Sequence, residues 1–99
     1  MHGRGEGTGQ GVWGEINDSL KTQAAVIGTT EGTGPAIEGR SVLGRGGVFK
    51  GKKAQIRLVA STATTKPSTG SRGDLFVDAS GRLWYCKNGG STTGWVQLA

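Results

Sequence analysis

A four-residue pattern occurs four times in the first half of the chain. Each copy places a small or β-branched residue, an apolar residue, a variable residue and a glycine in that order. The copies are Gly11-Val12-Trp13-Gly14, Ala25-Val26-Ile27-Gly28, Ala36-Ile37-Glu38-Gly39 and Val48-Phe49-Lys50-Gly51, and their closing glycines lie 14, 11 and 12 residues apart. This spacing is too short for a pair of helices but suits one short strand and one tight turn. The repeat therefore predicts a series of short β rungs.

A repeating unit of this size cannot bury its own apolar side chain, so it must pack against neighbouring units or other chains. Glycine supplies 20 of the 99 residues and the hydrophobic class only 33%. A lone chain therefore has little apolar surface with which to offset the entropy of ordering its glycines. We expect the chain to associate with copies of itself around a shared axial core. The residues predicted for that core are Val12, Val26, Ile37, Phe49, Ile56 and Leu58.

The charge pattern suggests an alternative function. The formal net charge is +5, and the basic residues are scattered singly apart from Lys50, Lys52 and Lys53. Such a cluster is a candidate contact for a polyanion. No helix-turn-helix, zinc-finger or RNA-binding signature accompanies it, so nucleic acid is not favoured as the partner.

The sequence does not predict an enzyme. Gly9-x-Gly11-x-x-Gly14 resembles a dinucleotide-binding fingerprint, but that motif needs a strand before it and a helix after it, and the flanking sequence offers β rungs. His2 is the only imidazole, and no serine, cysteine or carboxylate pair has a plausible base beside it. We therefore expect no catalytic residue, no cofactor and no metal site.

The sequence contains neither an apolar signal segment nor a stretch of membrane-spanning length, so we expect a protein that does not insert into membranes. Its single cysteine, Cys86, excludes an intrachain disulfide.

The pattern changes after Lys53. Residues 54–59 alternate polar and apolar side chains, which predicts a half-buried strand with Ile56 and Leu58 inward. The following residues are rich in serine and threonine and indicate an extended connection. We accordingly divide the chain into a flexible segment (1–8), a β-repeat stalk (9–59), a linker (60–72) and a C-terminal module (73–99).

The C-terminal module is predicted to be a β-hairpin with a third short strand. Residues 74–78 and 82–86 form the hairpin around a turn in which Gly81 can take the left-handed conformation, and residues 95–98 follow. Strand alternation places Trp84 and Tyr85 on opposite faces, so at most one of them is buried in the hairpin core. Trp84, Tyr85, Trp95 and the 87–94 loop are candidate glycan or receptor contacts, although core or subunit packing is favoured for the aromatic residues.

Together these segments resemble a known family. The glycine-rich repeats, Ile56-Arg57-Leu58-Val59, the Thr/Pro/Gly linker, and the strings GDLFVDASGRLWYC and GGSTTGWVQL look like the C-terminal part of bacteriophage tail-fibre and related virion fibre proteins. The similarity extends over residues 9–98.

The resemblance implies an all-β, intertwined homotrimeric fibre, similar to a β-helix or β-prism, that ends in a small hairpin module. It implies a structural, trimerising role in a virion tail fibre, which would place the protein in the virion or outside the cell. The implied partners are two further copies of the chain, other virion fibre proteins and a host-surface glycan or receptor. A glycan- or receptor-binding tip is the first alternative function, and polyanion binding is the second.

Overall fold

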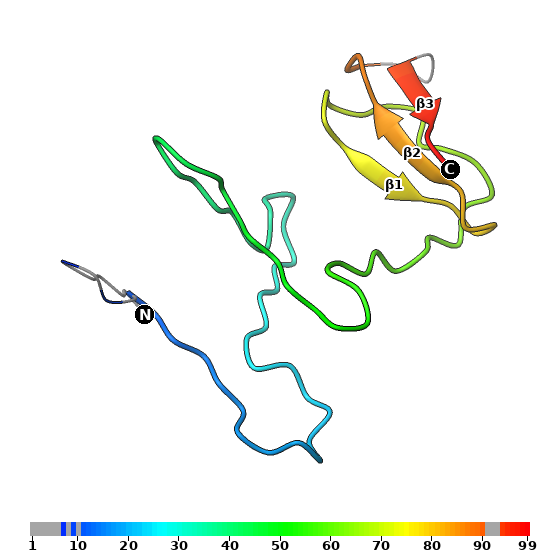
Figure 1. The fold of residues 1–99 in the computed structure, drawn as a ribbon. Helices are drawn as coiled ribbons and strands as arrows, with labels where there is room; N and C mark the ends of the chain where they lie inside the picture. The colour runs from blue at the N-terminus through cyan, green and yellow to red at the C-terminus, as the bar shows by residue number, and fades with distance from the viewer. Residues whose placement is uncertain (1–6, 8, 10, 91–93) are drawn as a thin grey trace. The chain divides into compact units, whose positions relative to one another are not determined.

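The computed structural model describes residues 7, 9, 11–90 and 94–99, and the chain divides into two compact units, Met1–Gly47 and Val48–Ala99. The described residues contain three strands, β1 (Leu75–Val77), β2 (Leu83–Cys86) and β3 (Trp95–Gln97), and no α-helix. The strands form one antiparallel sheet in the order β1-β2-β3 (Figure 1). The predicted all-β class and the C-terminal hairpin with its third strand are confirmed.

The turn between β1 and β2 forms because its residues satisfy one another's backbone groups. Gly81 has a φ of +83°, a conformation that glycine adopts without a steric penalty. Its N–H donates to the carbonyl oxygen of Asp78 at 3.0 Å, and the Asp78 N–H donates to the carbonyl oxygen of Arg82 at 3.1 Å. The left-handed glycine predicted for this turn is confirmed.

The strand register separates two faces of the sheet. Leu75, Tyr85 and Val96 lie side by side across the three strands, and Phe76, Trp84 and Gln97 form the neighbouring row. Because successive side chains point to opposite faces, these two rows lie on opposite sides of the sheet. The predicted separation of Trp84 from Tyr85 is confirmed.

The core of the C-terminal unit lies on the Trp84 side. Cys86 is fully buried and Trp95 is only 7% exposed. Phe76 packs against Trp95 edge to face, with ring centroids 6.2 Å apart and an interplanar angle of 66°. This side of the sheet holds the buried apolar side chains of the unit.

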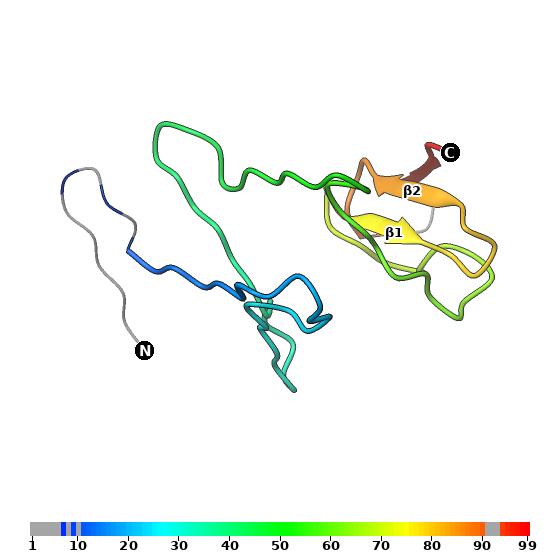
Figure 2. The ribbon, with the colours of Figure 1, turned by 60° about the horizontal axis from the view of Figure 1, so that its bottom comes forward.

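Residues 61–70, which we call the strap, cover this core (Figure 2). The N–H of Ser61 donates to the carbonyl oxygen of Val77 at 2.9 Å, and Ala63 accepts from the N–H of Ala79 at 2.7 Å. A Cβ placed on Gly70 would lie 2.6 Å from the Trp95 ring, so only glycine fits there. The segment predicted as a linker thus contacts the sheet and its turn at several points, although most of its residues are exposed.

Residues 11–59 form no strand in the single chain; extended stretches alternate with turns in the described structure. Local side-chain hydrogen bonds make several of the turns: Asp18 accepts from the N–H of Leu20, Thr30 from Gly32, and Ser41 from Gly44. The alternating residues 54–59, for which a strand was predicted, form no strand and contain a bend at Gln55. Their apolar side chains are exposed because no neighbouring strand creates a buried face there.

The closing glycines of the first two copies of the repeat lie against the next copy. A Cβ on Gly14 would lie 2.5 Å from Cγ2 of Val26, and one on Gly28 would lie 2.8 Å from Cγ1 of Ile37. Real Cβ atoms do not approach other heavy atoms this closely. Gly14 and Gly28 therefore give room for the apolar residue of the following copy, whereas Gly39 lies against the carbonyl oxygen of Gly46.

Candidate assembly surface

All six residues predicted to form the axial core are exposed in the single chain. The exposed fractions are 58% for Val12, 68% for Val26, 74% for Ile37, 62% for Phe49, 60% for Ile56 and 44% for Leu58. The structure therefore does not gather these side chains into a core within one chain. They remain available to pack against another chain.

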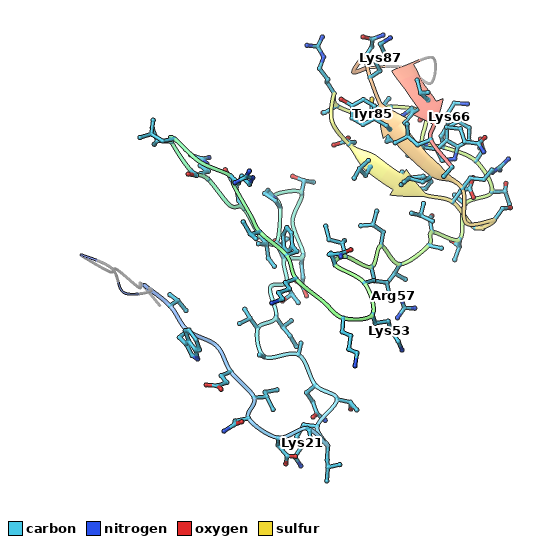
Figure 3. The ribbon with its side chains drawn as sticks, viewed as in Figure 1. Lys21, Lys53, Arg57, Lys66, Tyr85 and Lys87 are labelled. Atoms are coloured by element: carbon cyan, nitrogen blue, oxygen red, sulfur yellow. The ribbon has the colours of Figure 1, made fainter. Side chains whose placement is uncertain are left out.

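The aromatic residues considered for ligand contact do not share one surface. Trp95 is buried beneath the strap, and Tyr85 lies on the opposite face of the sheet from Trp84. Trp84 is engaged within the unit, since Lys66 Nζ lies 4.8 Å from its ring centroid and Arg82 Cζ lies 5.8 Å away. Lys66 and Tyr85 are labelled in Figure 3.

Two predicted segments are described only in part. In the predicted 87–94 loop, residues 91–93 lie outside the described residues, and so do residues 1–6 and 8 of the predicted N-terminal segment.

The lysine cluster is fully accessible. Lys50, Lys52 and Lys53 are all exposed, and Gly51 between them packs against the carbonyl oxygen of Ala54 in a tight turn. Lys53 and Arg57 project from the coil that precedes the strap (Figure 3). The structure thus brings the predicted polyanion residues together on one short, exposed turn.

Sequence reasoning missed the role of Asp78, a buried polar residue in the hairpin turn. Its carboxylate is fully buried and accepts four hydrogen bonds. The donors are the backbone N–H groups of Ser80 at 2.9 Å and Arg82 at 3.0 Å, Nε of Arg82 at 2.6 Å and Nε1 of Trp84 at 3.0 Å. The sequence signal that could have indicated this role is that Asp78 lies three residues before Gly81. Aspartate side chains in turns commonly accept hydrogen bonds from nearby backbone N–H groups.

Arg82 connects this carboxylate to the strap. Its Nη2 donates to the carbonyl oxygen of Thr64 at 2.6 Å, while its Nε donates to Asp78. One guanidinium therefore joins the hairpin turn to the segment that covers the core. The arrangement is a structural clamp, since every donor comes from within the C-terminal unit.

The electrostatics of Asp78 follow from these contacts. Burial by itself raises the pKa of the carboxyl group, but hydrogen bonds from Trp84, from Arg82 and from the Ser80 N–H favour the charged form and lower the pKa from 3.8 to about 2. The charged carboxylate is therefore the form that the folded unit requires.

We predict that Asp78 makes the C-terminal unit sensitive to acid. Its pKa is lower in the folded than in the unfolded state, so its stabilising effect is present above about pH 4 and is lost as the pH falls toward 2. The urea midpoint measured by tryptophan fluorescence should fall over this range in the wild type. Asp78→Asn should remove much of that pH dependence. The control variant Asp74→Asn, at an exposed position, should keep it. An equal pH response in wild type and Asp78→Asn would contradict this account.

Within the described ranges, no group of three His, Cys, Asp or Glu residues is placed to hold a metal ion, and no pocket is present. His2 lies outside those ranges. No helix in the described part of the chain is long and apolar enough to cross a membrane.

Comparisons with protein-family models, with curated proteins and with solved structures find no match for this chain.

Proposed function

We propose that this chain is a structural, non-enzymatic protein that assembles into a homotrimeric β-fibre, as a trimerising segment of a virion tail fibre that supports host attachment. The observation that carries the proposal is the exposure of the apolar residue in every copy of the repeat. Side chains such as Ile37 contribute to stability only when they leave water. In our proposal these side chains leave water by packing against another copy of the chain.

The glycine contacts support the same proposal. Gly14 accommodates Val26 and Gly28 accommodates Ile37, so the first three copies of the repeat are already in contact with their neighbours in the single chain. Stacked short units of this kind form a continuous core only when their apolar side chains meet a common partner. Intertwining of three chains supplies that partner, in keeping with the resemblance to virion fibre proteins.

The direct test is the mass of the protein in solution. We expect sedimentation equilibrium to give three times the mass of the 10.2 kDa chain at micromolar concentration. The circular dichroism spectrum should show more β-structure than three short strands can provide. A stable, folded monomer of 10.2 kDa at concentrations of about 100 μM would refute the proposal. Specific protein interfaces of standard size hold their subunits together well below that concentration.

Polyanion binding is a second candidate function, favoured by the exposed turn that carries Lys50, Lys52 and Lys53. Each lysine that neutralises a phosphate or sulfate group releases about one counterion. Replacing all three by glutamine should therefore weaken heparin binding and reduce the slope of log K against log salt by about 2 to 3.

The matched control for this prediction is the triple arginine variant, which keeps the charge and should retain most of the affinity. Equal heparin affinity for the wild type and the glutamine variant would exclude this turn as the binding site.

A glycan- or receptor-binding tip receives less support from the geometry. Its predicted contacts Trp84 and Tyr85 lie on opposite faces of the sheet, and Trp95 is covered by the strap. A sugar ring stacks on an exposed aromatic face, and these three residues do not present such a face jointly.

A further inference from the structure

Asn88 and Gly89 form an Asn-Gly pair in the turn after β2, next to Lys87, which is labelled in Figure 3. Both residues of the pair are exposed. Within the part of the chain that the structure describes, the Asn88 side chain and the Gly89 N–H take part in no hydrogen bond. The other asparagine of the sequence, Asn17, is also exposed, but Asp18 follows it.

A pair of this kind can modify itself in water. The backbone nitrogen of the second residue attacks Cγ of the asparagine, and a side chain on that second residue hinders the attack. Glycine has no Cβ, and its backbone rotates more freely than that of other residues. Gly89 therefore presents an unhindered nitrogen to Asn88, whereas the side chain of Asp18 shields the nitrogen that follows Asn17.

We infer that Asn88 is a site of spontaneous deamidation. The Gly89 nitrogen forms a bond to Asn88 Cγ and gives up its proton, and the side-chain nitrogen of Asn88 leaves as ammonia. The product is a five-membered succinimide ring. One water molecule then opens the ring at Cγ, which gives aspartate, or at the main-chain carbonyl carbon, which gives isoaspartate. In total, one asparagine and one water become one acidic residue and one ammonia.

The turn holds the main chain of Asn88 only weakly, so the rotation that ring closure requires is not strongly opposed. Among the described residues, its carbonyl oxygen accepts one hydrogen bond, from Sγ of Cys86 at 3.2 Å, and a thiol is a weak donor. Its N–H lies 3.5 Å from the carbonyl oxygen of Gly94, which is longer than a normal hydrogen bond.

The same turn is in contact with the strap. The N–H of Gly90 donates to the carbonyl oxygen of Gly70 at 2.8 Å, and a Cβ on Gly89 would lie 3.1 Å from that oxygen. Gly70 in turn lies against the ring of the buried Trp95. Isoaspartate lengthens the main chain by one carbon atom just before Gly89, so this fit is lost. Deamidation of Asn88 therefore loosens the strap over the core.

The test is to incubate the full-length chain at mildly alkaline pH, where the attacking nitrogen loses its proton more readily, and to map its peptides over time by mass spectrometry. We expect the Asn88 peptide to gain the mass difference between aspartate and asparagine about tenfold faster than the Asn17 peptide, or more. Chromatography should resolve the product into an isoaspartate and an aspartate form. Conversion of Asn88 no faster than that of Asn17 would overturn the inference.

Asn88→Gln is the matched control, because it keeps the amide at an exposed position but requires a larger ring to form. Peptides of this variant should keep their mass over the same period. The urea midpoint of the aged wild type should fall as isoaspartate accumulates, while that of aged Asn88→Gln should stay constant. An equal fall in both proteins would overturn the link between deamidation and the strap.

Asn88→Asp separates the two effects of the reaction, since it introduces the charge without lengthening the main chain. Its urea midpoint should stay close to that of the fresh wild type. A midpoint as low as that of the aged wild type would assign the loss to charge and overturn the role of the lengthened main chain. These outcomes do not depend on the mass of the assembly, so a monomeric wild type would refute the proposed fibre and leave this inference standing.

Discussion

Ile37→Asp should convert the proposed trimer into monomers. Ile37 is the apolar residue of the third copy of the repeat, is 74% exposed in the single chain and lies against Gly28 of the preceding copy. Burying an isoleucine side chain in a shared core stabilises the assembly by about 2 kcal/mol per chain. Three chains lose about 6 kcal/mol, which lowers the trimer association constant by roughly 10⁴-fold. The unpaired buried carboxylate increases that loss.

The control for this variant is Thr33→Asp, which adds the same charge to an exposed turn between two copies of the repeat. Sedimentation equilibrium of both variants at the same concentration provides the comparison, and Thr33→Asp should retain the mass of the wild type. A trimeric Ile37→Asp protein with wild-type affinity would remove the repeat from the assembly core.

Trp95→Ala should unfold the C-terminal unit. Trp95 is 7% exposed, contacts Phe76 edge to face and lies directly beneath Gly70 of the strap. Truncating a buried tryptophan to alanine costs about 3 to 5 kcal/mol, and a unit of this size has little more stability than that to lose. Near-ultraviolet circular dichroism and the dispersion of amide NMR signals should both decrease strongly.

Two control variants test whether the effect is specific to the buried Trp95 side chain. Trp13→Ala removes a tryptophan that is 70% exposed in the other unit and should leave the C-terminal unit folded. Trp95→Phe should be milder than Trp95→Ala, because the indole N–H of Trp95 has no hydrogen-bond partner among the described residues and the aromatic packing is partly kept. A folded Trp95→Ala protein that had lost only binding to a host surface would instead support the tip function.

The hairpin was predictable because its signals are local. The run before Asp78, the left-handed Gly81 and the apolar run that starts at Leu83 specify two strands and their turn without any distant contact. Alternation within β2 likewise separated Trp84 from Tyr85. Short-range geometry was sufficient in each case.

The strap and the clamp were not predictable in this way. Residues 61–70 carry no strand pattern, and their place on the sheet depends on the fit between Gly70 and Trp95 and on the hydrogen bond from Arg82 to Thr64. These contacts join residues far apart in the sequence. For the same reason the sequence left Trp95 open between core or subunit packing, which it favoured, and ligand contact, and the structure buries it.

The sequence by itself determined the periodic spacing of one apolar residue and one glycine, the all-β class and the C-terminal hairpin, because each depends on residues close together in the chain. Only the tertiary structure decided which side of the sheet is covered. The strap buries Cys86 and Trp95 on one side, and the row of Leu75, Tyr85 and Val96 stays open on the other. Alternation assigns side chains to two faces, but a face becomes core only where another segment packs against it.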